Sequence, residues 1–536
     1  MRQSLLIGGV VSIGAIMAVA CGSSGSSGGT DDAGSSGTSG TSGTSGTSGT
    51  SGTSGSSGDG GDGGETTPPL KAGQVSFIGV TADAQAVYTV KGTGTERNIE
   101  AVPVAGGTPA TIGTVATDDD VSIAGNTVAF WTAIDAAAGV GKLSLWTKAG
   151  GAKANVATES IPGLISSSED GSRIAFAFAS PADTTSLAVT TPGAPAVVAN
   201  ATTAIVPNVN VGSPACNADF GFVGKTFFSA HCVGPGNGAT ALTKASLFTV
   251  ADVANPTLTT LVDGAVAANS LKPTWSGDKT GAHLLVFTLT LSQARVLTIP
   301  AGGAPTVANI ENNVASGFLS DDGLKVFYRT AGLAFRSAPT ANNGTVAQPP
   351  AGAVTLVADG GFPSTIGASK DKAHVLFRKL APVGAAGEAP RVDINLIDTV
   401  TAAQVGTPIV ATATGFPSGF TATSTHIIYL TEVSAAGIGK LKVRPVTVAG
   451  AEREVAAVAG LPRPLPTGSK ALFFDNPKAL GQGVTVDVKV FDAAGSAAPT
   501  AVAAAVDPFY QVSGTKLVYV KPGAAAGAGL YAVDIP

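Results

Sequence analysis

The sequence is poor in charge, in aromatic rings and in cysteine. Only 12% of its 536 residues are charged and 6% are aromatic, and there are 3 cysteines. The formal net charge is -5, and no run of Lys or Arg occurs anywhere. Because nucleic-acid binding needs clustered cations to replace phosphate counterions, this composition predicts no nucleic-acid partner.

Turn and strand formers dominate instead. Gly numbers 71 and Pro 32, whereas Glu and Lys are few. Gly and Pro are unfavourable inside helices, and a background of Val and Thr with frequent tight turns suits short strands. The composition therefore predicts an all-β protein.

Residues 1–21 have the pattern of an export signal. Arg2 provides a short cationic start, Leu5 to Val19 is apolar, and small residues lead into Cys21. A stretch of this length and order is typical of a secretory signal rather than of a membrane-spanning helix.

The step from Ala18 to Cys21 resembles the lipobox of bacterial lipoproteins, although that family prefers Leu where Ala18 stands. The resemblance implies cleavage before Cys21 and acylation of it, and each buried methylene adds about 0.8 kcal/mol of membrane affinity. The alternative is an ordinary cleaved signal with an incidental cysteine. We expect a lipid-anchored protein of the cell envelope, outside the cytoplasm. Gly22 in place of Asp favours the outer membrane, at its periplasmic or its surface face.

Residues 22–69 are of low complexity and repeat Gly-Thr-Ser six times between residues 37 and 54. Without large aliphatic side chains nothing offsets the entropy of ordering, so we expect a disordered linker spanning roughly 40 Å. A G-x-S-x-G match at residues 25–29 lacks the strand and helix of a nucleophile elbow. The acids between residues 59 and 65 are interpreted as solvated spacers, not as a calcium loop.

The body, residues 70–536, contains an internal repeat. A turn of small polar residues, as in Ser168-Glu-Asp-Gly171, leads into an apolar strand that ends near an aromatic residue. Ten copies end at Tyr88, Phe130, Phe176, Phe228, Phe287, Phe327, Phe377, Tyr429, Phe473 and Tyr519, at a mean spacing of about 48 residues.

A second motif is a strand that runs into Gly-Gly, at residues 106–107, 150–151 and 302–303. Such pairs suit two-residue hairpins, in which both positions have positive φ. Each unit thus has about four antiparallel strands. The run from Ile174 to Phe178 is apolar on both sides, which indicates an inner strand covered on both faces. Such sheets must stack on their neighbours. The sequence predicts a β-propeller of about ten four-stranded units, as one large ring or two smaller propellers.

The Ser-x-Asp-Gly-x-x-Ile-Ala-Phe pattern of residues 168–176, with Leu-Trp and Gly turns elsewhere, resembles the WD40-like repeat of TolB-type propellers. The resemblance covers nearly all of residues 74–536 and implies the fold but little of the function. The interval from Phe228 to Phe287 and the Pro-rich stretch 461–466 are candidate boundaries between two propellers. A blade that joins residues 75–79 to the C-terminal strand would favour a single body.

Few residues are candidates for chemistry. Cys216 and Cys232 are expected to form a disulfide, because the exported chain meets an oxidising compartment. Closing this loop would add up to ~3 kcal/mol. The alternative, a metal site with His231, lacks a second ligand pair. Asp118-Asp119-Asp120 is interpreted as a solvated turn rather than a calcium site. The other histidines, His283, His374 and His426, occupy similar places before strands and are interpreted as structural.

We therefore predict no catalytic residue, no metal and no cofactor. The favoured function is an extracytoplasmic binding or scaffold module that presents its loops to a protein, peptide or glycan. The alternative is a glycan hydrolase or lyase whose acids converge on the central channel from separate blades. A propeller peptidase would need an α/β-hydrolase segment, which the sequence does not contain.

Overall fold

A computed structural model describes the body of the chain, and residues 1–66 lie outside the described residues. The described ranges are 67–92, 94–168, 170–180, 184–191, 204–206, 219–223, 226–233, 244–250, 258–264, 275–277, 282–288, 293–298, 306–320, 322–332, 334–341, 349–358, 365–380, 391–401, 403–406, 409–412, 417–434, 436–447, 451–477, 484–523 and 527–536. The predicted signal and almost all of the predicted linker therefore remain predictions.

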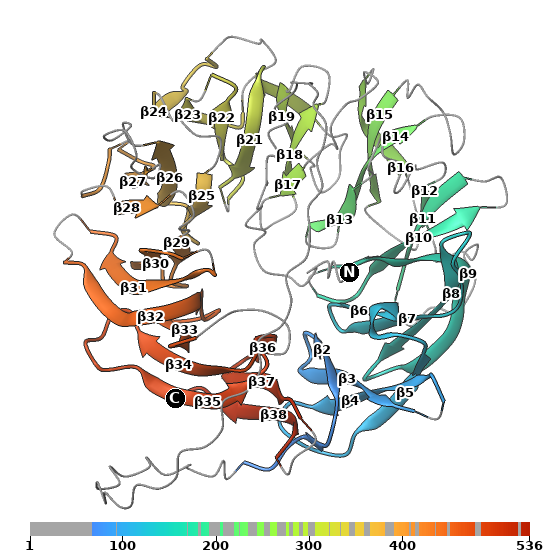
Figure 1. Cartoon of the computed structure of the whole chain (residues 1–536). Coiled ribbons are helices and arrows are strands. Elements are labelled where there is room, and N and C mark those ends of the chain that lie inside the picture. Colours follow the sequence, from blue (N-terminus) through green and yellow to red (C-terminus); the bar gives the residue numbers. More distant parts are fainter. Residues whose placement is uncertain are drawn as a thin grey trace, which may run out of the picture. The chain divides into compact units, whose positions relative to one another are not determined.

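Antiparallel sheets make up nearly all of the described structure (Figure 1). Among the described residues, six sheets have four strands and two have seven, and each seven-stranded sheet consists of two four-stranded units that share one strand. The body therefore has ten units, which we call blades 1–10 in chain order. The predicted β-propeller of about ten four-stranded units is confirmed.

The first five blades cover residues 76–311. Blade 1 is β2 (Ser76–Val80), β3 (Gln85–Lys91), β4 (Arg97–Pro103) and β5 (Ala110–Val115). Blades 2 and 3 are β6 (Val121–Ala124), β7 (Thr127–Asp135), β8 (Val140–Thr147), the shared β9 (Gly151–Ser167), β10 (Ile174–Ser180), β11 (Thr184–Thr190) and β12 (Ala204–Val206). Blade 4 is β13 (Asp219–Val223), β14 (Thr226–Val233), β15 (Lys244–Val250) and β16 (Leu258–Gly264). Blade 5 is β17 (Trp275–Gly277), β18 (His283–Thr288), β19 (Gln293–Thr298) and β20 (Thr306–Glu311).

The last five blades cover residues 314–534 and borrow one strand from the start of the body. Blade 6 is β21 (Val314–Leu319), β22 (Lys325–Thr330), β23 (Phe335–Pro339) and β24 (Val354–Val357). Blade 7 is β25 (Thr365–Ala368), β26 (His374–Leu380), β27 (Arg391–Asp398) and β28 (Ile409–Thr412). Blades 8 and 9 are β29 (Pro417–Phe420), β30 (His426–Thr431), β31 (Ile438–Pro445), the shared β32 (Arg453–Pro464), β33 (Lys470–Asp475), β34 (Val486–Asp492) and β35 (Thr500–Val506). Blade 10 is β36 (Tyr510–Ser513), β37 (Lys516–Lys521), β38 (Gly529–Asp534) and β1 (Lys71–Ala72).

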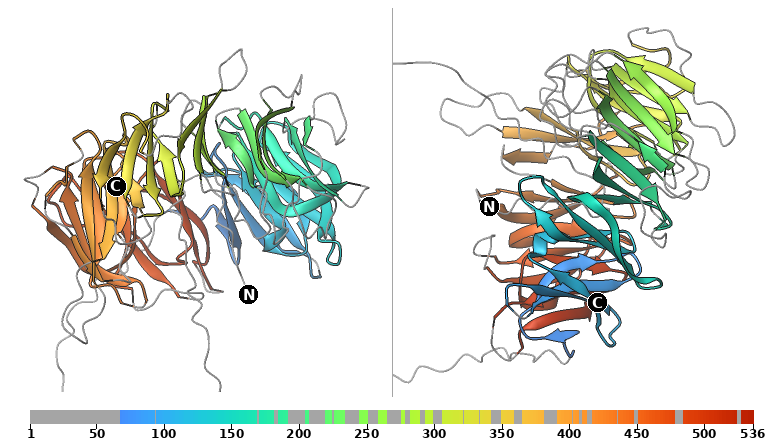
Figure 2. Two further views of the ribbon diagram at one scale, coloured as in Figure 1. Left: turned by 90° about the horizontal axis from the view of Figure 1, so that it is seen from above. Right: turned by 90° about the vertical axis from the view of Figure 1, so that its right-hand side faces the viewer.

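The second strand of each blade carries the core. All ten aromatic residues that end the sequence repeat lie in these second strands. In β10 alternate residues pack on opposite sides: Ile174 and Phe176 join the cluster shared with blade 2, whereas Ala175 joins the cluster shared with Phe227 of blade 4. This confirms the predicted inner strand that is covered on both faces. Figure 2 shows these twisted sheets from two further directions.

The two ends of the body meet. The backbone of β1 pairs with β38, so that Lys71 lies opposite Leu530 and Ala72 opposite Gly529. Side chains of blades 10 and 1 share one hydrophobic cluster, which includes Tyr88 and Val518. From the sequence we predicted that residues 75–79 form the strand that closes the body. That placement was wrong, because β2 begins the sheet of blade 1 and only the two residues of β1 complete blade 10.

The Pro-rich stretch 461–466 is not a boundary between propellers. Most of it forms the second half of β32, which pairs with β33, while the first half pairs with β31. Between Gly460 and Arg463 the register shifts, and Leu461 adopts a positive φ of 39°. A bulge of this kind lets one strand turn from the outer edge of blade 8 into the inner edge of blade 9.

The only helical element among the described residues is the 3-10 turn η1 (Asp118–Asp120). None of the described segments forms a helix that is long and apolar enough to span a membrane.

Candidate functional site

The innermost strand of each blade carries small and hydroxyl residues. Gly lies within most of these strands, as at Gly79 of β2 and Gly317 of β21. In these ten strands, counting for β9 and β32 only the residues that pair with β10 and β33 (160–167 and 459–464), the charged residues described are Asp219 of β13 and Arg463 of β32. The Arg463 guanidinium lies 4.9 Å from the centre of the Tyr510 ring. Phe77 of β2 packs against Phe509, with ring centres 5.6 Å apart.

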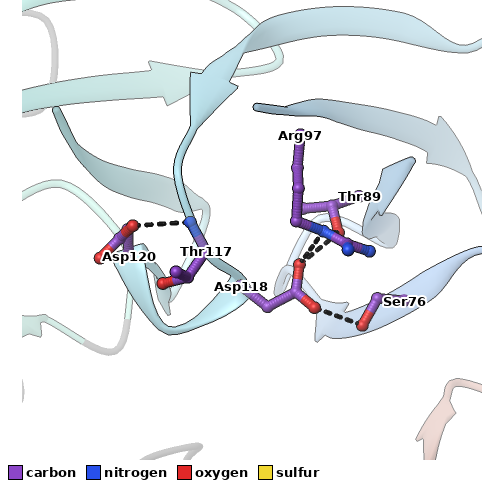
Figure 3. Close-up of polar contacts among 6 residues, drawn as sticks. All are labelled: Ser76, Thr89, Arg97, Thr117, Asp118 and Asp120. Carbon is purple, nitrogen blue, oxygen red and sulfur yellow. Dashed lines mark hydrogen bonds and ion pairs between the residues drawn. The ribbon is translucent and has the colours of Figure 1, made fainter. Parts of the chain in front are cut away.

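The acid triplet lies where the chain passes from blade 1 to blade 2, and its first member binds back to blade 1 (Figure 3). One carboxylate oxygen of Asp118 accepts a hydrogen bond from Ser76 Oγ at 2.6 Å, and the other accepts one from Thr89 Oγ1. Arg97 Nε lies 2.7 Å from that second oxygen and also donates to Thr89 Oγ1 at 2.9 Å. Asp118 therefore fixes the crossover to three strands of blade 1.

The other two acids of the triplet do not converge on this site. Asp120 turns away and accepts a hydrogen bond from the Thr117 backbone N–H at 2.8 Å (Figure 3), and Asp119 is exposed. A calcium ion requires several oxygens around one point. Across the ranges the structure describes, no group of three or more His, Cys, Asp or Glu side chains is placed to hold a metal ion. The triplet is a turn, as predicted, but Asp118 is part of an ion-pair network rather than merely solvated.

The repeat motif itself forms a recurring hydrogen-bonded turn. In blade 6, Ser320 Oγ donates to the Asp322 carboxylate at 2.5 Å and accepts the Lys325 N–H at 3.0 Å. The hydrogen bond from Ser320, with a second from the Leu324 N–H, lowers the pKa of Asp322. The hydroxyl groups of Ser168, Ser369, Thr81 and Thr421 accept the equivalent backbone N–H in their own turns. The motif is therefore a structural turn, which explains its recurrence without any shared ligand.

Three blades also share a pairing of a buried tyrosine with a glutamate. Tyr88 donates to Glu100 at 2.7 Å, Tyr328 donates to Glu311 at 2.7 Å, and Tyr429 donates to Glu452. Burial, together with the hydrogen bond to the carboxylate, raises the pKa of each of the three phenols. The cations that complete these groups are Lys71, Arg336 and Lys442, at 2.8, 2.5 and 2.5 Å from their carboxylates. With raised pKa values the three phenols stay protonated, and each can donate a hydrogen bond that holds its carboxylate in place.

Three histidines lie where the sequence predicts a structural position. His283, His374 and His426 are the first residues of β18, β26 and β30. The His374 N–H donates to Ser369 Oγ at 2.9 Å and the His426 N–H donates to Thr421 Oγ1 at 3.2 Å, so both take part in the repeat turn. Burial lowers the pKa of His426.

The predicted sulfur chemistry falls largely outside the described residues. Cys21 and Cys216 are not among them. Cys232 lies in β14 opposite Ala245, but its side chain and that of His231 are outside the described set. The lipidation of Cys21 and the disulfide between Cys216 and Cys232 therefore stay predictions.

Sequence reasoning missed the partners of Asp118, because Ser76 and Thr89 lie 42 and 29 residues away from it. It also missed Arg329, which lies in β22 and is only 7% exposed. A signal for Arg329 was present: a cation directly follows the apolar run Val326 to Tyr328. Buried cations are rare enough that such a position merits attention.

No protein-family model matches the chain, and no curated protein matches it significantly. Solved structures with a similar arrangement include a protein assigned as TolB from Agrobacterium tumefaciens, at 14% identity and TM-score 0.26, covering 46% of this chain and 83% of that one. The β-propeller domain of the Trilobed protease from Pyrococcus furiosus is 11% identical at TM-score 0.32, covering 59% and 92%. Prolyl oligopeptidase B from Galerina marginata is 11% identical at TM-score 0.36, covering 79% of this chain and 55% of its own. The propeller fold rests on the sheets described above.

Proposed function

We propose that the protein is a membrane-anchored, extracytoplasmic binding or scaffold protein. The single observation that carries the anchoring is the sequence: an apolar segment from Leu5 to Val19 leads through small residues into Cys21. Acylation of Cys21 would hold the chain on the bilayer by burying methylene groups. Gly22 after the cysteine supports placement at the outer membrane.

The binding role is supported by how the body uses its polar residues. The recurring turns, the Tyr–Glu pairs and the Asp118 network all hold strands or blades together. Because these positions are structural and recur, the loops that differ between blades are the parts that can specify a ligand. A protein, peptide or glycan at these loops is the proposed partner.

Anchoring is tested by growing cells that express the full chain with an alkyne-tagged fatty acid and separating their proteins in Triton X-114. We expect label and detergent partitioning for the natural chain and loss of both in Cys21→Ser. The matched control is Cys232→Ser, which should keep both. Label that persists in Cys21→Ser would contradict the proposal.

Binding is tested by presenting the acylated full chain to arrays of envelope glycans and peptides, with products followed by mass spectrometry. Retention of one ligand class without turnover is expected. Release of shortened glycans would instead favour the hydrolase or lyase alternative.

A further inference from the structure

Arg329 is buried and has no anionic partner among the described residues. Its side chain is 7% exposed, and its Nε atom has no hydrogen-bond partner among the described residues. Phe327 in the same strand and Phe335 opposite Arg329 on β23 are each 1% exposed. Burial lowers the pKa of the Arg329 guanidinium. A guanidinium that is removed from water without an anion is unfavourable, so this position calls for one.

The register of blade 1 shows what such a position holds. Tyr88 and Tyr328 are structurally equivalent, because each is a buried second-strand tyrosine whose ring packs into the cluster shared with the preceding blade. The residues that follow them, Thr89 and Arg329, are therefore equivalent as well. Each lies opposite a serine of the innermost strand, Ser76 in blade 1 and Ser316 in blade 6.

In blade 1 this pair of positions forms a receptor for a carboxylate. Ser76 and Thr89 donate to the two oxygens of Asp118, and Arg97 adds a cation. In blade 6 the serine is kept, and the guanidinium is on the strand itself at Arg329. The described strands on either side of the crossover to blade 7, β24 and β25, contain no acid. Blade 6 thus has the donors of the blade 1 receptor without a described acceptor.

We propose that Ser316 and Arg329 form a binding site for a carboxylate of a ligand, where blade 6 faces blade 7. A guanidinium presents two parallel N–H donors that match the two oxygens of a carboxylate. Ala331 and Gly332, which follow Arg329 by two and three residues, are exposed, so the turn that ends this strand reaches solvent. The inference deepens the proposed binding function by naming the chemistry of the ligand: a small dicarboxylate or an acidic side chain or C-terminus of a peptide.

The test is isothermal titration of the full chain at constant ionic strength. One arm uses succinate. The other compares a peptide that has a free C-terminal carboxylate with the same peptide carrying a C-terminal amide. Binding of succinate alone identifies a small ligand. Tighter binding of the peptide with the free carboxylate than of the amidated peptide identifies a peptide ligand. We expect Arg329→Gln to weaken binding by about tenfold or more, since hydrogen bonds to charged groups are the strong ones. Arg329→Lys should recover only part of the affinity, because the fork geometry is lost.

The matched control is Arg295→Gln. The pKa of Arg295 is also lowered by burial, but its Nε already donates to Gln293 at 2.8 Å. This variant should bind like the natural chain. If Arg329→Gln does not fold, Ser316→Ala provides the second variant, with a smaller loss expected.

Three results would overturn the proposal: no carboxylate binding in either arm, equal binding by Arg329→Gln and the natural chain, or binding that arises only in Asp359→Asn. The last would mean that Asp359, which follows β24 in the sequence, fills the site itself. The fatty-acid labelling of Cys21 is a separate readout, so failure of anchoring and failure of this site are distinguishable.

Discussion

At the scale of single residues, the repeat turn explains why its motif contains glycine. The fourth residue of the turn has a positive φ in all five copies with the hydroxyl hydrogen bond: 67° at Gly171 and 70° at Gly323, but also 58° at Ala84, 55° at Lys372 and 60° at Ser424. Glycine adopts this conformation without steric cost, whereas other residues are disfavoured by roughly 1–2 kcal/mol. The copies of the turn that have another residue in place of this glycine therefore carry local strain.

We expect Ser424→Gly to stabilise the protein by about 1 kcal/mol, because it relieves this strain. Ser424 Oγ lies 3.4 Å from the Asp371 N–H and also hydrogen-bonds to the Asp371 side chain, so the loss of these contacts offsets part of the gain. Urea unfolding of the full chain measures the change. Ala422→Gly in the same turn, where φ is not positive, is the control and should destabilise slightly. A loss of stability in Ser424→Gly would contradict the argument.

At the scale of elements, the turn hydroxyl links two strands of one blade. Ser320 Oγ accepts the Lys325 N–H and donates to Asp322, so both ends of the turn depend on one atom. We expect Ser320→Ala to cost about 1–2 kcal/mol, because it leaves a partly buried N–H without its acceptor. Ser320→Thr is the matched control, since Thr81 and Thr421 fill this place in other blades.

Thermal unfolding of the two variants side by side measures the effect. If Ser320→Ala and Ser320→Thr unfold at the same temperature, the hydroxyl is not what holds the turn.

The elements were also the scale at which sequence reasoning succeeded best. The alternation of Ile174 to Phe178 and the turn before it place the second strand of each blade, because local pattern and burial agree there. The shared strands β9 and β32 could not be predicted in this way. Whether a strand ends or continues into the next sheet depends on hydrogen-bond partners far away in the sequence. The same holds for Asp118, whose role depends on the register between β2 and β3.

At the scale of the whole molecule, lowering the pH tests the carboxylates of several turns together. Hydrogen bonds from Ser320, the Thr401 N–H and Ser469 lower the pKa values of Asp322, Asp398 and Asp492, respectively. A carboxylate with a lowered folded pKa contributes stability above its unfolded pKa, about 3.9, and loses it as the pH falls through the folded value.

We therefore expect the melting temperature to be nearly constant between about pH 5 and 7 and to fall below about pH 4. Calorimetry across this range, with Asp322→Asn and Asp492→Asn as comparisons, measures the dependence. Each substitution should reduce the fall in melting temperature at low pH. If the melting temperature of both variants falls with pH as in the natural chain, other groups control the acid dependence.

The closure of the body by β1 also determines how the molecule responds to force. Any tension in the chain before Leu70 reaches β1 first, where the Leu70 N–H bonds to the Leu530 carbonyl at 2.8 Å and the Gly73 N–H bonds to the Ala528 carbonyl at 2.9 Å. The Lys71 ammonium meanwhile holds Glu100 of blade 1 at 2.8 Å. A pull would thus peel two residues from the edge of blade 10 while β36, β37 and β38 stay paired. We therefore expect β1 to detach from the edge of blade 10 under tension before any force acts on the core of the body.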